Sequence, residues 1–268
     1  MSSSSPFVVH NDAFRAILGE GPTLELLAEN DSYPFAHEAG IFIASRNEPF
    51  ITSNCMHDAV AGQRAQISRV HLDKASNSSL VTCEEISRPD SHGNGRVNYK
   101  DGIIIYAQGS RYAPSGLYEM SIAPPYSTTL LKSDFQGQPF NSVNDAVVHS
   151  DGTIWLPNQV YRFNPVDGSI RAMADGFGRP NGICTPPHEK VVYVTDTDWI
   201  HGDGTTDDTT PSSIYAFDVA LYHGQPFLTN RSVANFCFGR NGELFLLNEN
   251  RLWKASLKGK VKGALLGI

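Results

Sequence analysis

Short apolar runs separated by tight polar turns recur along most of the chain, in the same internal order each time. Each unit has an apolar run, a turn rich in Asn, Asp or Gly, a second apolar run, and a third run that contains an aromatic or aliphatic pair. Short runs rich in β-branched and aromatic residues predict strands, and the turns predict hairpins. About five such units can be recognised, and they begin near His37, Gly95, Val143, Asn181 and Val233.

Strand-rich repeats of roughly 40 to 50 residues are typical of a β-propeller, in which each repeat forms one blade. The rival architecture is a β-sandwich of short strands, but the constant order within the unit favours the propeller. We therefore predict an all-β fold with a single β-propeller domain over residues 31–268. Residues 1–30 are expected to form an N-terminal leader segment with one short helix or an edge strand.

Two of the units place an Asn directly before an apolar run. In Phe140–Trp155 this residue is Asn144, followed by Asp145, and in Arg179–Asp196 it is Asn181. For a single Asn-Asp or Asn-Gly, a turn residue is the simpler interpretation. The repetition in matching context instead predicts two amide side chains at matching ends of neighbouring hairpins. If those ends converge, they form a pocket of neutral oxygen ligands, which suits a hard cation such as Ca²⁺.

Composition narrows the class of protein. The chain has 268 residues, 40% of them hydrophobic, which is enough for a substantial core. Its net charge of −7 is dispersed and argues against nucleic acid or an anionic membrane as the partner. No apolar run approaches the ~18 to 20 residues of a membrane span, and the start lacks a signal-peptide pattern, so we expect a soluble, cytoplasmic protein. Four widely spaced cysteines favour buried free thiols over a zinc site or disulfides.

At the two Asn motifs the chain resembles the SMP-30/gluconolactonase/LRE-like family, especially its fungal lactonase-like members. The resemblance runs from about Pro34 to Trp253 and is most specific across Gly137–Asp196. It implies a six-bladed β-propeller whose central channel holds one divalent metal, usually assigned as calcium. It also implies an enzyme that hydrolyses lactones.

The resemblance further implies a set of metal ligands. The family has a Glu at the start of its first blade, which corresponds to Glu38. Glu20, in the string Gly-Glu-Gly-Pro, resembles the family's local sequence too, but no strand, turn and strand follow it at the right distance. The family's Asn-Asp motif corresponds to Asn144 and Asp145, and the Asn of its Pro-Asn-Gly motif corresponds to Asn181. Calcium is the expected metal, with Mg²⁺, Mn²⁺ or Zn²⁺ as alternatives.

The chain departs from the family pattern in two places. After the strand that ends at Trp155, family members continue into Thr-Asp-Pro and a loop that helps cover the pocket, whereas this chain passes from Leu156 into Pro-Asn-Gln-Val. The family's Pro-Asp-Gly motif, whose Asp is a metal ligand and the expected general base, is absent from this sequence. The blade that carries it would fall between Arg231 and Ser232. A five-bladed form and a sequence that omits segments both stay open as explanations.

Lactone hydrolysis needs a Lewis acid that stabilises the oxyanion and a base that activates water. Glu38, Asn144 and Asn181 would supply one negative charge and two neutral oxygens, which predicts loose metal binding unless another carboxylate joins. Asp196 is attractive for that role because it ends the strand that follows Asn181. The full set of candidate carboxylates is Asp145, Asp196 and Asp198.

Histidines offer a further candidate for the base. His37 precedes Glu38, and an imidazole titrates near neutrality, although a side chain on the opposite face of the strand is an equally good interpretation. His149 and His188 lie in turns at the far end of their hairpins from the Asn residues, so we expect them to be solvent-exposed. The polar segment Asp203–Ser213 lacks the ligand spacing of an EF-hand and predicts a solvated loop.

Together these features predict a calcium-dependent, lactonase-type hydrolase that opens a small lactone or cyclic ester. The alternative is a non-hydrolytic propeller that binds a ligand or shapes a reactive metabolite after losing the family's general base. An interaction propeller that uses its rim has no support from WD-type dipeptides. Substrate identity and oligomeric state leave no readable signal. The candidate catalytic residues are Asn144, Asp145, His37 and Asp196.

Overall fold

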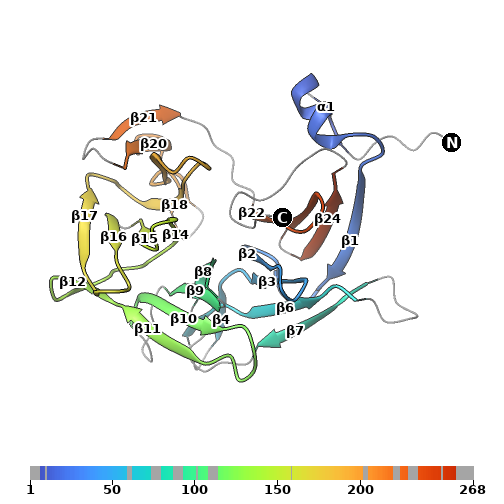
Figure 1. Cartoon of the computed structure of the whole chain (residues 1–268), viewed down its shortest axis with the longest axis horizontal. Coiled ribbons are helices and arrows are strands. Elements are labelled where there is room, and N and C mark those ends of the chain that lie inside the picture. The colour runs from blue at the N-terminus through green and yellow to red at the C-terminus, as the bar shows by residue number, and fades with distance from the viewer. Residues whose placement is uncertain are drawn as a thin grey trace. The chain divides into compact units, whose positions relative to one another are not determined.

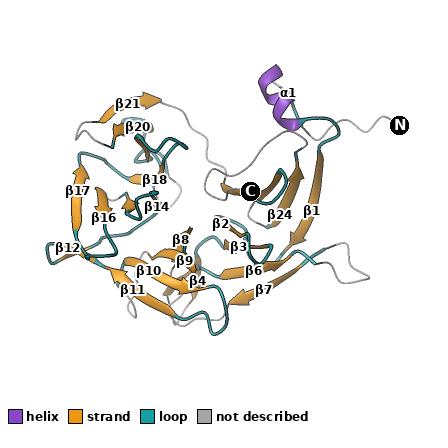
Figure 2. Ribbon diagram, in the orientation of Figure 1, coloured by secondary structure: helices purple, strands orange, loops and turns teal. Residues whose placement is uncertain are grey.

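The computed structural model describes residues 7–9, 11–58, 62–73, 80–86, 93–100, 102–107, 114–157, 159–201, 205–219, 224–228, 235–248 and 250–257. Regular structure within these residues is almost entirely β (Figure 2). The helix α1 (Asp12–Leu18) begins after Asn11, whose side-chain oxygen accepts a hydrogen bond of 2.8 Å from the Phe14 amide. No helix in the described part of the chain is long and apolar enough to span a membrane.

The described strands form five four-stranded antiparallel sheets, one for each predicted unit. The predicted fold class, an all-β propeller with five recognisable blades, is confirmed. The chain divides into two compact units, each described by itself below. Unit 1 comprises Met1–Ser87 and Ala234–Ile268 and contains two of the sheets, and unit 2 comprises Arg88–Val233 and contains three.

Unit 1 joins the two ends of the chain in one sheet. Figure 1 shows β1, in blue, beside β24, in red, and Leu26 lies opposite Trp253 in this antiparallel pair. The edge strand expected within residues 1–30 is therefore β1, and it belongs to a blade. In order across the sheet, the strands are β1 (Thr23–Glu29), β24 (Arg251–Ser256), β23 (Glu243–Asn248) and β22 (Asn235–Phe238).

The other sheet of unit 1 follows chain order. A short two-stranded hairpin, β4 (Met56–Asp58) with β5 (Gly62–Arg64), lies in the chain between the second and third strands of this sheet. The strands of the sheet are β2 (Glu38–Ile43), β3 (Glu48–Thr52), β6 (Ile67–His71) and β7 (Thr82–Ile86).

Unit 2 contains three sheets, all in chain order, and a second short hairpin formed by β12 (Asp134–Phe135) and β13 (Gln138–Pro139). Residues 229–234, where the sequence places the missing Pro-Asp-Gly blade, lie outside the described residues. The first sheet consists of β8 (Gly93–Tyr99), β9 (Gly102–Ala107), β10 (Gly116–Ser121) and β11 (Thr128–Lys132). The second consists of β14 (Val147–Val148), β15 (Ile154–Leu156), β16 (Val160–Phe163) and β17 (Ile170–Ala174). The third consists of β18 (Pro180–Cys184), β19 (Val191–Asp196), β20 (Ser213–Asp218) and β21 (Gly224–Leu228).

The apolar residues that alternate along the strands are buried between neighbouring sheets of the same unit. In unit 1, Phe42 of β2 and Phe245 of β23 stack with ring centroids 5.8 Å apart. In unit 2, Ile154 and Trp155 of β15 belong to the cores on opposite faces of their sheet. Fully burying a side chain of this size contributes ~1.5 to 3 kcal/mol, so these layers hold the sheets together.

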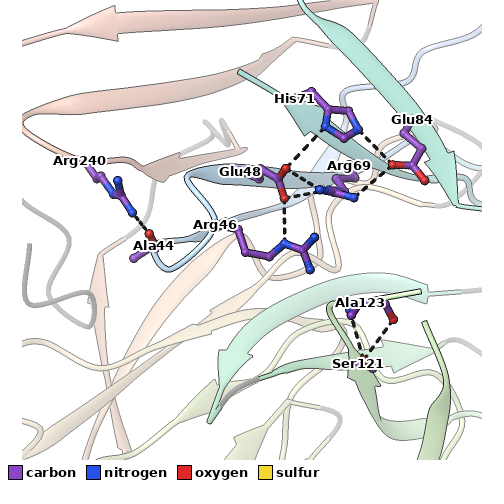
Figure 3. A network of polar contacts seen from close by, with 9 residues as sticks. All are labelled: Ala44, Arg46, Glu48, Arg69, His71, Glu84, Ser121, Ala123 and Arg240. Atoms are coloured by element: carbon purple, nitrogen blue, oxygen red, sulfur yellow. Dashed lines mark hydrogen bonds and ion pairs between the residues drawn. The ribbon is translucent and has the colours of Figure 1, made fainter. Parts of the chain in front are cut away.

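A polar cluster ties three strands of unit 1 together (Figure 3). Arg69 of β6 donates to both carboxylate oxygens of Glu48 in β3, at 2.6 and 2.8 Å. Burial alone would raise the pKa of Glu48, but the hydrogen bonds and charge of Arg69, together with Arg46 and His71, lower that pKa below its usual value. His71 also contacts Glu84 of β7 at 3.0 Å, so the cluster fixes the order of β3, β6 and β7.

The four cysteines carry thiols and form no disulfide. Cys237 is buried, and burial raises its pKa to about 12. Cys55 and Cys184 are exposed, so the prediction that the thiols are buried is wrong for these two. Cys184 is the last residue of β18, and Cys55 directly precedes β4.

Candidate functional site

Asp145 links the ends of two neighbouring sheets in unit 2. Its Oδ1 accepts a hydrogen bond of 2.8 Å from the Ala146 amide, just before β14. Its Oδ2 accepts one of 2.7 Å from the amide of Ile183, which lies in β18. The segment that carries Asn144 is therefore joined directly to the segment that carries Asn181.

Asn181 lies in an irregular part of the ladder between β18 and β19. Pro180 pairs with Asp196 and Ile183 pairs with Val194, with a shift of register between the two pairs. The shift leaves Asn181 and Gly182 outside regular pairing, and the Gly182 amide donates instead to the Thr195 hydroxyl at 2.7 Å. A bulge of this kind redirects a side chain at the end of a strand.

Asp196 holds the strand that follows Asn181 to the loop that precedes it. The side chain is almost fully buried, and its two oxygens accept hydrogen bonds of 2.9 Å from the amides of Gly178 and Arg179. Gly178 also packs against the Asp198 carboxylate so closely that a Cβ atom would lie 2.5 Å from its Oδ2. The loop that leads into the Pro-Asn-Gly segment is thus held by the carboxylate of Asp196 and packed against that of Asp198.

The structure brings together four of the sequence-predicted residues: Asn144, Asp145, Asn181 and Asp196. Asn144 and Asn181 are half-buried, and neither amide side chain has a hydrogen-bond partner among the residues that the structure describes. Asp145 and Asp196 differ, because both oxygens of each carboxylate accept backbone N–H groups. The two amides are therefore available to a ligand, and the two carboxylates position the backbone around them.

His37 and Glu38 lie in unit 1, at the start of β2. The His37 amide donates to the Thr52 carbonyl at 2.9 Å, and the register then shifts between Glu38 and Ile41, where Ala39 adopts a φ of 57°. The imidazole Nε2 lies 3.7 Å from the Glu38 Oε1. The two side chains are therefore neighbours.

Among the described residues, no group of three or more His, Cys, Asp or Glu side chains could hold a metal ion. The predicted ligands Asn144 and Asn181 are amides, and Glu38 lies in unit 1 while both amides lie in unit 2. Glu20, the weaker alternative to Glu38, is exposed between α1 and β1. The described part of the polar segment, residues 205–213, connects β19 to β20 and is mostly exposed, as predicted.

The prediction of an exposed His149 is wrong. Only 13% of this side chain is exposed, and its ring contacts the Asp151 carboxylate at 3.1 Å and the Glu189 carbonyl at 3.2 Å. Glu189 also accepts hydrogen bonds from the Ser150 amide at 3.1 and 3.2 Å. The two hairpin turns therefore pack against each other and cover the ring. His188, in the second turn, is exposed as expected.

Asp151, in the first of these turns, makes the free energy of unfolding depend on pH in the acid range. Burial alone would raise its pKa, but hydrogen bonds from Thr153, at 2.6 and 2.9 Å, and the charges of His149 and Arg162 lower it to about 2. The unfolded value is about 3.9, so this stabilisation is present above about pH 4 and is lost as the pH falls to about 2.

We expect Asp151→Asn to lower the free energy of unfolding by about 1 kcal/mol at pH 6, because the charged contacts of the carboxylate are lost. The effect is no larger because the side chain is more than a third exposed and solvent screens those contacts. Urea unfolding at pH 6 and at pH 2 measures the effect. The difference between variant and wild type should vanish at pH 2, and an equal difference at both pH values would contradict the assignment.

Sequence comparison identifies the family. The pattern of the SMP-30/Gluconolactonase/LRE-like region matches residues 60–261, and the chain belongs to this family. A lactonohydrolase of Aspergillus oryzae, OryL, is 25% identical in an alignment of length 221 that covers 72% of this chain and 48% of that protein. The chain therefore spans about half the length of this relative.

Solved structures show the same fold. A gluconolactonase of Xanthomonas campestris matches with a TM-score of 0.59 and 20% identity, over 91% of this chain and 92% of that one. A calcium-binding protein of Agrobacterium tumefaciens, regucalcin, matches with a TM-score of 0.52 and 14% identity, over 89% of this chain and 98% of that one. These likenesses show that the chain shares the propeller fold of both proteins.

The sequence indicated the Asn pair but not the roles of its neighbours. Nothing local in Asp145 reveals that its carboxylate reaches Ile183, 38 residues further on. The only available signal for Asp196 was its place at the end of a strand, which fits a catalytic carboxylate and a positioning carboxylate equally well.

Proposed function

We propose that this chain is a divalent-metal-dependent hydrolase that opens small lactones, with Asn144 and Asn181 of unit 2 as metal ligands. Membership of the SMP-30/gluconolactonase/LRE-like family supports the class of reaction. The observation that carries the proposal is the hydrogen bond of 2.7 Å from the Ile183 amide to Asp145, which ties the two Asn-bearing sheet ends to each other.

The donor chemistry of the two amides fits a hard cation such as Ca²⁺, because amide oxygens are among the oxygen ligands it prefers. The two amides have no competing hydrogen bond among the described residues, which supports their assignment. When bound, such a cation would polarise the lactone carbonyl and stabilise the oxyanion. Because both of these ligands are neutral, we expect the cation to be held loosely.

His37, in unit 1, stays a candidate for the general base. Its imidazole lies 3.7 Å from the Glu38 carboxylate, which can orient the ring. Asp145 and Asp196 were the other candidates. Both already accept backbone N–H groups on each oxygen, so we assign them to positioning Asn144 and Asn181.

Hydrolysis of a lactone panel tests the proposal. Protein stripped with a chelator and dialysed should not hydrolyse glucono-δ-lactone, and added calcium should restore turnover. An open-chain methyl ester serves as the matched control and should react much more slowly. A folded, calcium-loaded sample that opens no lactone would contradict the proposal.

Two observations favour a second candidate function. The carboxylates of Asp145 and Asp196 are occupied with backbone amides, and the sequence has no Pro-Asp-Gly motif. A propeller of this kind could bind a ligand without hydrolysing it. Calcium-dependent binding of a lactone that survives unhydrolysed would favour this second function over the first.

A further inference from the structure

A cavity of about 650 Å³ opens in unit 2 beside the β12–β13 hairpin. Three aromatic rings form its floor: Phe135 of the hairpin, Phe140, and Tyr161 of β16. The centroid of the Tyr161 ring lies 5.0 Å from that of Phe135 and 5.6 Å from that of Phe140. Phe140 and Tyr161 are buried and Phe135 is half-buried, so the three rings form a packed aromatic cluster at the cavity.

Exposed amide side chains surround this floor: Gln136, Gln138, Asn141 and Gln159. None of the described residues that line the cavity carries a charge. The Tyr161 hydroxyl donates to the Gln159 Oε1 at 3.0 Å, which fixes the amide oxygen and leaves its NH₂ group to donate. Amides both donate and accept, as hydroxyl groups do, and aromatic faces pack against the C–H faces of a saturated ring.

The cavity lies at the end of the sheet that carries Asn144. The strands β14 and β15 are antiparallel, with Val148 opposite Ile154, so the turn that contains Gln159 lies at the sheet end where β14 begins. Asn141 precedes Asn144 by three residues, which places their Cα atoms at most about 11 Å apart. Backbone bonds hold this segment, among them one of 2.9 Å from the Phe140 amide to Ser133.

We propose that this amide–aromatic cavity binds an uncharged, hydroxyl-bearing ring attached to the lactone, such as the second sugar of a glycosylated aldonolactone. The inference rests on the proposed function, because it treats Asn144 as part of the reacting site. It adds a substrate class: lactones that carry a neutral sugar should react faster than the bare lactone.

Direct binding tests the cavity without any hydrolysis. Methyl β-D-glucopyranoside is titrated into the metal-free full chain and followed by NMR. We expect saturable shifts, a weaker response to charged glucuronic acid, and about tenfold weaker binding in the double variant Asn141→Ala/Gln159→Ala, because two hydrogen bonds are lost. Asn248→Ala, which removes an exposed amide from β23 of unit 1, is the matched control and should bind as wild type does.

Hydrolysis separates this inference from the proposed function. The ratio of kcat/KM for cellobiono-δ-lactone to that for glucono-δ-lactone should fall about tenfold in the double variant and stay constant in Asn248→Ala. Hydrolysis with an unchanged ratio, or no glycoside binding, would overturn the cavity's role while the lactonase proposal stands. Glycoside binding that the double variant weakens, in a chain that opens neither lactone, would overturn the proposed function and the cavity's role in it, but leave the ligand class in place.

Discussion

Replacing Asn181 by alanine should abolish measurable calcium binding while leaving the fold intact. The side chain is half-buried, lies in a bulge and has no hydrogen-bond partner in the described part of the chain, so its loss removes a ligand without removing a structural contact. Loss of even an outer-shell partner of a metal ligand costs about 10- to 100-fold in affinity, so loss of a direct ligand should cost at least about 100-fold. Calorimetric titration of metal-stripped protein measures the effect.

Asn144→Ala should behave in the same way, because it removes the other proposed amide ligand of unit 2. Asn248→Ala is the matched control for loss of an amide elsewhere, and near-ultraviolet circular dichroism checks that each variant is folded. Calcium affinity like that of the wild type in both Asn181→Ala and Asn144→Ala would rule out this pair of ligands.

Replacing Asp196 by alanine should lower the free energy of unfolding by about 3 kcal/mol. The carboxylate is 1% exposed and accepts hydrogen bonds from the amides of Gly178 and Arg179, and bonds to a charged acceptor contribute about 1.5 to 3 kcal/mol each. Urea unfolding at pH 7 measures the loss. Asp207→Ala, which removes a loop carboxylate bonded to Thr209, should cost much less, because solvent screens its contacts.

Asp196→Asn then separates a positioning role from a catalytic one. An amide keeps the shape and one acceptor oxygen, so we expect an intermediate loss of stability and weaker calcium binding, since Asn181 follows the segment that Asp196 holds. If Asp196 were the general base, this variant would lose turnover and keep the calcium affinity of the wild type. That result would contradict the positioning role.

The repeated strand pattern was sufficient to predict the blades. The turn at Arg46-Asn47-Glu48 separates β2 from β3, and the turn at Ser150-Asp151-Gly152 separates β14 from β15, as the alternation of apolar runs and turn residues indicated. Such signals are local, because a hairpin is encoded by residues that are close in sequence. The five units and the propeller class followed from them.

Long-range contacts were out of reach of the same reasoning. The pairing of β1 with β24 joins residues more than 200 positions apart, and nothing in Thr23–Glu29 specifies that partner. His149 was expected to be exposed because it lies in a turn, but the following hairpin covers it through Glu189. Sequence patterns indicate which side chains are candidates for binding a ligand. Which of those side chains instead contact other residues depends on tertiary packing.

The most direct test of the account is a calcium titration of the metal-stripped full chain, followed by calorimetry, with the hydrolysis rate of glucono-δ-lactone measured at each point. We expect one saturable binding event, with a rate that rises in proportion to the bound fraction and reaches its plateau with it. Full hydrolysis before calcium is added, or saturation of the site without hydrolysis, would contradict the claim that this chain is a metal-dependent lactonase.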